Sequence, residues 1–315
     1  MRSRLVLLAA LVIALASVGL AITRLAASSP SHPPVAHASL PPLSASYLGV
    51  YEGGAPPGTA PIATFGQAVG REPNIAGYYS GWAEPFATSF AEKLRAMGII
   101  PFVQIDPMFA SVPAIAAGEY DTYLRSYAES VKDFGHAVVI GFGHEMNAPW
   151  YPWGYKRLAP KTFIAAWRHI VTVFRSQGAD NVTWLWTVNQ DLSTTGPVAA
   201  WWPGSSYVTW VGIDGYYFRS SDTFASVFGR TIRQVRAFTS KPVLLTETAV
   251  GPRAGQFLKI TNLFEGMQQY GTLGLVWFDK DQDHGIFHQD WRIEGSTLAE
   301  AALRAWVAPL TLARP

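Results

Sequence analysis

The sequence of 315 residues contains no cysteine. Disulfide bonds, a thiolate nucleophile and thiolate metal ligands are therefore excluded, although export is not, since a secreted chain can fold without disulfides. A strong excess of charge of one sign is also lacking: the formal net charge is +2, and no run rich in lysine and arginine occurs. A nucleic acid held on a basic face is therefore not an expected partner.

Apolar and aromatic side chains are abundant. Hydrophobic residues make up 49% of the sequence, with 12 Trp, 13 Tyr and 17 Phe. This composition supports a large buried core. Aromatic enrichment is common in proteins that act on polysaccharides, but aromatic residues also fill large cores, so composition alone leaves both interpretations open.

The N-terminal segment is typical of an export signal. Arg2 and Arg4 precede an apolar run over residues 5–22, as a basic region precedes the hydrophobic region of a signal sequence. We predict a signal peptide or signal anchor over residues 1–27 and favour the cleaved form. Either form predicts a secreted or extracellular protein, with membrane association only if the segment stays uncleaved. Residues 28–45 are rich in Ser, Pro and Ala and predict a linker.

From residue 46 to residue 312, short apolar runs alternate with amphipathic stretches. The alternation predicts parallel strands joined by helices, and eight such units predict a single (β/α)8 barrel as the catalytic domain. A doubly wound open sheet is the alternative, but no Gly-x-Gly-x-x-Gly follows the first strand. The expected strands cover residues 47–51, 74–79, 99–105, 137–142, 182–188, 208–213, 242–246 and 273–278.

Three stretches have clear helical spacing of their apolar residues. The best defined covers residues 163–174, between Pro160 and Gly178, which are a start signal and a stop signal. The other two cover residues 123–134 and 224–238. Each lies between two expected strands, as the barrel requires.

Two glutamates stand at the ends of expected strands. The fourth strand runs into Glu145 and the seventh into Glu247. The carboxyl ends of barrel strands gather at the face where catalytic groups collect, and strands four and seven lie almost opposite each other. We therefore predict that the two carboxyls flank one glycosidic bond. A separation of about 5–5.5 Å would give retention and about 6.5–9.5 Å inversion; the alternative is that each is only a polar residue at a strand end.

The sequence around these glutamates resembles glycoside hydrolase family 26, which is best known for β-mannanases. Residues 144–147 (His-Glu-Met-Asn) and 150–153 (Trp-Tyr-Pro-Trp) resemble its acid/base signature. Residues 181–189, 202–216 and 241–247 are similar to its fifth strand, its approach to strand six and its nucleophile strand. The likeness extends over most of the chain beyond the linker.

The resemblance implies a retaining double displacement in a (β/α)8 barrel, with no metal and no cofactor. Glu145 would be the acid/base and Glu247 the nucleophile. His144 would hydrogen-bond near the sugar at the cleavage point, and Tyr216 would orient Glu247 and help to keep it ionised. Because Glu145 must carry a proton in the first step, its pKa is expected to be raised.

Five further residues have expected roles in substrate binding or in support of the site. Trp150 and Trp277 would stack against sugar rings, although core packing is the alternative for Trp277. Asp279 would hydrogen-bond a sugar hydroxyl. Asp106 is either a substrate ligand or a structural acceptor, and Asn147 belongs to the acid/base signature. These residues line the expected carboxyl face of the barrel.

One position departs from the family pattern. Many members carry arginine four residues before the acid/base, where this chain has Gly141. The missing guanidinium removes a positive charge from the floor of the site. This departure bears on which sugar is bound more than on which reaction is catalysed.

An acidic loop after the last strand has some features of a calcium site. Asp279, Asp281 and Asp283, with Asp290 further on, follow part of the spacing of a calcium loop, but the required glycine falls one place late, at Gly285. We favour a solvated loop that faces the sugar and predict no metal site.

These patterns predict a secreted endo-β-glycanase, with β-mannan as the expected substrate. A β-1,3-1,4-glucanase and a β-1,3-xylanase are alternatives within the same family. Two alternatives belong to another functional class: a non-catalytic barrel that binds polysaccharide, and a membrane-tethered partner in polysaccharide export. The presence of both glutamates argues against the first, and only an uncleaved anchor supports the second. We expect a monomer.

Overall fold

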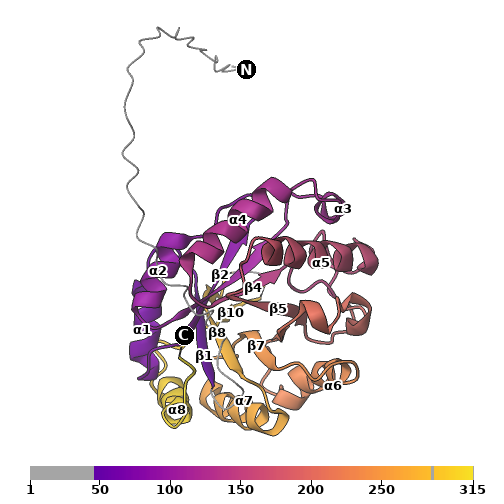
Figure 1. The fold of residues 1–315 in the computed structure, drawn as a ribbon. Coiled ribbons are helices and arrows are strands. Elements are labelled where there is room, and N and C mark those ends of the chain that lie inside the picture. The colour runs from indigo at the N-terminus through magenta and orange to yellow at the C-terminus, as the bar shows by residue number, and fades with distance from the viewer. Residues whose placement is uncertain (1–45, 285–286, 315) are drawn as a thin grey trace, which may run out of the picture. The chain divides into compact units, whose positions relative to one another are not determined.

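The computed structural model describes residues 46–284 and 287–314, which form a closed barrel of eight parallel strands (Figure 1). Each strand pairs with the next, and the last pairs with the first to close the barrel. The predicted (β/α)8 architecture is confirmed. The strands are β1 (Tyr47–Glu52), β2 (Ile75–Gly81), β3 (Ile100–Asp106), β4 (Val138–Phe142), β5 (Val182–Asn189), β6 (Trp210–Asp214), β7 (Val243–Thr248) and β8 (Gly274–Asp279).

Every strand begins and ends within two residues of its predicted bounds. The prediction succeeds because helices cover the outside of the barrel and side chains fill the inside, so the strands are apolar along most of their length. One apolar cluster fills the barrel interior near the amino ends of the strands. Its members include Tyr47, Ile75, Phe102, Val139, Leu185, Trp210, Leu244 and Val276.

An outer ring of helices surrounds the strands (Figure 1). The predicted stretch between Pro160 and Gly178 is α5, which begins at Pro160. The stretch at 224–238 is only partly α-helical, because Ala225–Gly229 form a π-helical turn before α6. The helices are α1 (Ala60–Val69), α2 (Thr88–Ala96), α3 (Val112–Ala116), α4 (Asp121–Phe134), α5 (Pro160–Ser176), α6 (Arg230–Arg236), α7 (Gln256–Tyr270) and α8 (Thr297–Val307).

The predicted signal segment, 1–27, and linker, 28–45, lie outside the described residues. Within the part of the chain that is described, none of the helices has the length and apolar character needed to cross a membrane. All of the barrel elements lie inside the predicted domain, 46–312.

The seam between β1 and β8 depends on a glycine. Gly274 has φ of 153°, and a β-carbon built on it would lie 1.9 Å from the backbone oxygen of Tyr47. Six consecutive residue pairs join the two strands, beginning with Tyr47 and Gly274. A side chain at Gly274 would therefore push apart the strands that close the barrel.

We expect Gly274→Ala to lower the free energy of unfolding by about 3 kcal/mol, because both the strained φ and the backbone clash oppose the folded state. Urea denaturation measures the change. Gly53→Ala is the matched control, since a β-carbon there meets nothing within 4 Å. Equal stability of the two variants would contradict this account of the seam.

Candidate active site

Glu247 lies near the carboxyl end of β7 and is held by two tyrosines. The Tyr216 hydroxyl, just beyond β6, donates to Glu247 Oε2 at 2.6 Å. The Tyr79 hydroxyl, from β2, donates to Glu247 Oε1. Each carboxylate oxygen thus has its own phenol donor, and the two donors fix its orientation and stabilise its negative charge.

Glu145 follows β4 on a tight turn rather than on the strand itself. β4 ends at Phe142, and both Gly143 and Glu145 have φ of 54°. A left-handed backbone is uncommon for a residue with a side chain. The turn is held because Glu145 N–H donates to Thr187 O of β5 at 2.9 Å, and Ala148 N–H donates to Glu145 O at 2.8 Å.

The Glu145 carboxyl is buried, with 7% of the residue exposed. Asn189, at the end of β5, donates its amide N–H to Oε1, and the Trp150 indole donates to Oε2 at 2.6 Å. Burial raises the pKa of Glu145 to about 7, and the charge of Glu247 adds to this rise, whereas His144 and the two donors oppose it. The carboxyl therefore exchanges its proton near neutral pH.

His144 connects Glu145 to the end of β3. Its Nδ1 lies 2.9 Å from Asp106 Oδ1, and its Nε2 lies 3.1 Å from the Tyr151 hydroxyl. Burial alone would lower the pKa of His144, but the Asp106 carboxylate outweighs burial, and the pKa is raised to about 10. The imidazole is therefore cationic at neutral pH, and Asp106 accepts its hydrogen bond.

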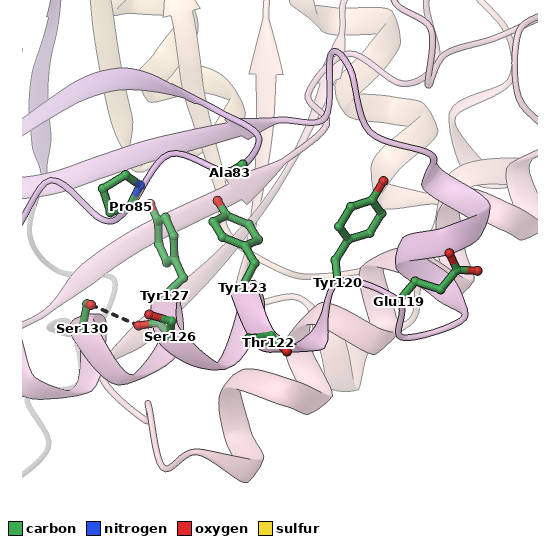
Figure 2. Close-up of a pocket in the computed structure, with 9 residues that line it drawn as sticks. All are labelled: Ala83, Pro85, Glu119, Tyr120, Thr122, Tyr123, Ser126, Tyr127 and Ser130. Atoms are coloured by element: carbon green, nitrogen blue, oxygen red, sulfur yellow. Dashed lines mark hydrogen bonds between the residues drawn. The ribbon is translucent and has the colours of Figure 1, made fainter. Parts of the chain in front are cut away.

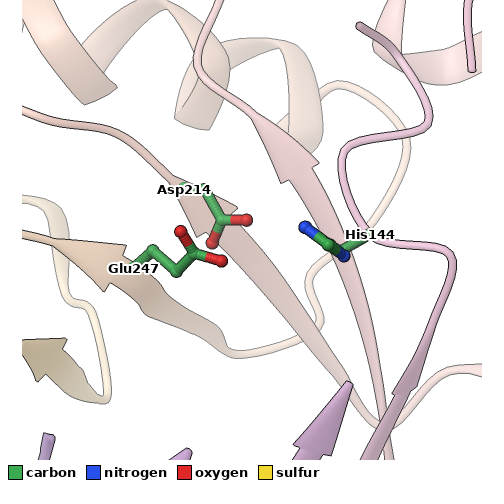
Figure 3. A group of neighbouring side chains, drawn as sticks. All are labelled: His144, Asp214 and Glu247. Atoms are coloured by element: carbon green, nitrogen blue, oxygen red, sulfur yellow. The ribbon is translucent and has the colours of Figure 1, made fainter. Parts of the chain in front are cut away.

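A third carboxyl, Asp214 of β6, lies beside Glu247 (Figure 3). It is fully buried, accepts from the Thr246 hydroxyl at 2.5 Å, and its Oδ2 has no partner among the described residues. Burial, followed by the charges of Glu247 and Glu145, raises the pKa of Asp214 well above its usual range. Burial and the neighbouring carboxylates therefore favour the protonated form of Asp214 over the charged one.

Ligand atoms of His144, Asp214 and Glu247 lie within 4.8 Å of one another, as a metal site would require. The imidazole is protonated, and both ring nitrogens already have partners, so it offers no free lone pair to a cation. The arrangement in Figure 3 fits proton and charge balance better than metal coordination.

Two predicted sugar-binding residues are buried instead. Trp277 has 0% exposure, and its indole donates to Trp291 O at 2.9 Å, so the alternative of core packing fits and stacking on a sugar does not. Asp279 is 4% exposed and accepts from Ile293 N–H at 2.8 Å. Both side chains turn away from solvent because the segment after β10 (Gln289–Asp290) packs over the end of β8.

Asp279 also lies close to Glu52 and Glu294, with carboxylate oxygens within 4.8 Å. Burial, aided by the contact with Glu294, raises the pKa of Asp279 to about 10, and burial raises the pKa of Glu52 to about 7. The cluster therefore holds protons rather than full negative charge. It joins the ends of β1 and β8 at the carboxyl end of the barrel.

Asn147 and Trp150 have separate roles. Asn147 is fully buried, donates to Asn189 O at 2.9 Å and accepts from Asn189 N–H at 2.8 Å, so it supports the turn rather than touching solvent. Trp150 is 44% exposed while its indole nitrogen binds Glu145. It therefore combines an open aromatic face with a fixed orientation next to the acid.

The space beside Gly141 is occupied by a neutral amide. A β-carbon at Gly141 would lie 1.9 Å from Gln104 Oε1, while Gln104 Nε2 donates to the Thr187 hydroxyl at 3.0 Å. Gln104 is buried on β3, the strand next to β4. Where many family members have an arginine side chain, this chain therefore has the polar, uncharged amide of Gln104.

The loop after β8 does not gather the aspartates of the considered calcium site. Asp281 and Asp290 both pair with Arg292, at 3.1 and 2.8 Å, whereas Asp279 faces the carboxyl cluster. The considered glycine, Gly285, lies outside the described residues. Asp283 is exposed.

The same loop contains a His-x-x-x-His pair, His284 and His288, which was not considered when no metal site was predicted. That spacing places two imidazoles together on a helix. His284 and His288 instead lie in a turn between the short strands β9 (Asp281–Gln282) and β10, and both are exposed. His288 Nδ1 lies 3.3 Å from Asp283 O.

Several contacts of the site were not predicted from the sequence. Tyr79 and Asn189 each contact one of the two glutamates, and Tyr151 contacts His144. Tyr79 lies near the end of β2 and Asn189 at the end of β5. The rule used for the glutamates, that polar groups at strand ends meet at one face, would have selected both.

Comparisons with known proteins give a consistent result. Residues 102–304 match the family described as Glycosyl hydrolase family 26. Endoglucanase H of Acetivibrio thermocellus is 31% identical over 268 residues, which is 80% of this chain and 29% of that protein. Beta-1,3-xylanase TXYA of a Vibrio species is 26% identical over 156 residues, which is 49% of this chain and 32% of that protein. The chain thus spans about a third or less of these relatives.

A GH26 β-mannanase of Bacteroides ovatus has a similar fold. The TM-score is 0.60 at 16% identity, over 85% of this chain and 90% of that one. At this identity the likeness concerns the barrel and not the substrate.

We expect Trp150→Phe to raise the pKa of Glu145 above its value of about 7. The indole N–H stabilises the ionised carboxylate, so its removal favours the protonated form. Carboxyl ¹³C NMR of labelled protein, titrated from pH 4 to pH 9, measures the shift. A pKa that stays unchanged or falls would contradict the role given to this hydrogen bond.

Proposed function

The chain belongs to glycoside hydrolase family 26, and we propose that it is a retaining endo-β-glycanase that cleaves a mannan-type polysaccharide by double displacement. One observation carries the proposal: two glutamates reach the same end of the barrel with different surroundings. Each carboxylate oxygen of Glu247 accepts a hydrogen bond from a phenol, and Glu145 is a buried acid with a raised pKa. Retaining glycosidases use such a pair.

In the first step the Glu247 carboxylate attacks the anomeric carbon, and the bond from that carbon to the glycosidic oxygen breaks. Glu145 gives its proton to the leaving oxygen, and a glycosyl ester of Glu247 forms. In the second step Glu145, now ionised, takes a proton from water as the water oxygen attacks the anomeric carbon. The ester breaks, Glu247 leaves as a carboxylate, and Glu145 is again protonated.

The residues around the pair support both steps. Tyr216 and Tyr79 hold the nucleophile in place while it carries charge. The cationic His144 adjoins the site and stabilises Glu145 when it becomes an anion. The exposed face of Trp150 provides a surface on which a sugar ring next to the cleaved bond can stack.

A β-glucan is the second candidate substrate. The 31% identity with Endoglucanase H supports it, and the neutral Gln104 beside Gly141 fits a floor that differs from the arginine-bearing pattern. The likeness to a β-1,3-xylanase makes xylan a third test substrate. Hydrolysis of purified mannan, galactomannan, lichenan and β-1,3-xylan, with ¹H NMR of the newly formed anomer, tests both the sugar and the retention.

We further propose that the enzyme acts outside the cytoplasm. The basic residues Arg2 and Arg4 and the apolar run over 5–22 support this location. Long polysaccharides are also substrates that an enzyme meets outside the cell. N-terminal sequencing of the protein from culture medium would test both secretion and cleavage.

Replacing either glutamate separates the two roles. We expect Glu247→Ala to lose all measurable turnover, because no other group can form the ester. We expect Glu145→Ala to slow hydrolysis of polysaccharide by about 10²–10⁴-fold, while a substrate with a good leaving group, such as a dinitrophenyl glycoside, still forms the ester without acid assistance.

Azide provides the matched check on this pair. With Glu145→Ala it should attack the ester and give a glycosyl azide of retained configuration, whereas with Glu247→Ala any azide product, formed by direct attack on an activated glycoside, should have inverted configuration. Turnover of polysaccharide near the wild-type rate by either variant would refute the assignment, provided that circular dichroism shows each to be folded.

The pH dependence of hydrolysis is expected to follow the protonation of Glu145. Because Glu145 must be protonated in the first step, we expect kcat/KM to fall as the pH rises through about 7, tenfold per pH unit. The residual activity of Glu145→Gln on the dinitrophenyl glycoside should lack this alkaline limb. An unchanged limb in that variant would assign it to another group.

A further inference from the structure

A groove of about 560 Å³ lies on the outer side of the barrel, between α4 and the loop that follows β2. Three tyrosine rings stand in a row along one wall, Tyr120, Tyr123 and Tyr127, and Ala83 and Pro85 lie opposite them (Figure 2). Tyr120 and Tyr123 are half-buried, whereas Tyr127 is 2% exposed and lies deepest. Two of the rings are thus open to a ligand.

The walls of the groove are tied to each other. The Tyr123 hydroxyl donates to Glu84 O at 3.0 Å, and Glu84 in turn accepts from Gly81 N–H at 2.7 Å. Trp82 packs edge-on to Tyr120 and at a tilt to Tyr123, with ring centroids 5.4 and 5.0 Å away. The tyrosine wall and the loop therefore form one fixed shape, which is common for sites that bind small ligands.

The lining is neutral and rich in hydroxyl groups. Besides the tyrosines it contains Thr122, Ser126 and Ser130, and Glu119 is its one acidic residue. None of the nine lining residues is Lys, Arg or His. Flat apolar faces combined with uncharged hydrogen-bonding groups suit a neutral polyhydroxylated chain, and the absence of cationic residues from this lining disfavours an anionic one.

The groove is separate from the catalytic end of the barrel. Its lining includes neither Glu145 nor Glu247. Trp82 lies between the groove and the catalytic end: its ring is 6.0 Å from that of Phe142 of β4, and its backbone N–H donates to Asp106 O. A ligand in the groove would thus be separated by Trp82 from the ends of β3 and β4, near which Asp106 and His144 lie.

We propose that this groove is an accessory binding site for the neutral polysaccharide that the enzyme cleaves. This inference rests on the proposed function, because it takes the same polymer as ligand. A long chain held at two places on one molecule gains avidity, since the second contact forms at a high effective concentration. A short oligosaccharide held at the catalytic end gains nothing from the groove.

The test uses full-length protein in which Glu247→Ala prevents turnover. Tyr120→Ala removes an open ring, and Ser126→Arg obstructs the groove from an exposed position on α4 while keeping all the rings. We expect each to weaken binding to insoluble mannan or β-glucan by about tenfold in depletion isotherms. In the active enzyme, the same two changes should leave kcat/KM for a tetrasaccharide within about twofold of the parent.

Phe257→Ala is the control, since it removes an aromatic ring that is 36% exposed on α7, across the barrel from α4 (Figure 1). Binding by both groove variants at the affinity of this control would overturn the accessory site, including the case in which the groove serves a protein. Thermal melts identify a variant that fails to fold, and Ser126→Arg then decides the question alone. If the parent enzyme hydrolyses none of the glycans, the proposed function fails, and polymer binding still reports on the groove.

Discussion

A carboxyl group that is taken out of water must either find hydrogen-bond donors or keep a proton, and this constraint organises the carboxyl end of the barrel. Glu247 takes the first route, with one tyrosine on each oxygen. Asp214 takes the second, since its pKa is raised well above the usual range. Glu145 lies between them, because burial opposes its charge while His144 and two donors favour it. A group with such balanced surroundings can serve as acid and then as base.

The fold was predictable because it depends on a repeated and simple pattern. Strands covered on both faces are short apolar runs, so their bounds were found within two residues from hydrophobicity alone. The stretch at 224–238 was less predictable: its apolar spacing suits a helix throughout, yet Ala225–Gly229 adopt a π-helical turn. The choice between these two windings depends on packing against neighbouring elements, which periodicity does not report.

The site was predictable in its chemistry and less so in its contacts. Both glutamates were placed from strand-end position and motif, and that reasoning extends to Tyr79 and Asn189. Trp277 shows the limit of the same rule. A residue at a strand end points either into the barrel mouth or beneath a covering segment, and Trp277 is covered because its indole binds the backbone of Trp291. Sequence alone does not say which loop folds over which strand.

The two ends of the described chain meet at the opposite face of the barrel. Ser46, just before β1, forms a bridge with Leu312, and its backbone exchanges hydrogen bonds of 2.7 and 3.0 Å with Thr311 and Ala313. The described part of the chain therefore begins and ends at the same place, at the amino ends of the strands. A circularly permuted barrel, with Ser46 and Ala313 joined by a short linker and new ends opened elsewhere, should keep its catalytic end intact.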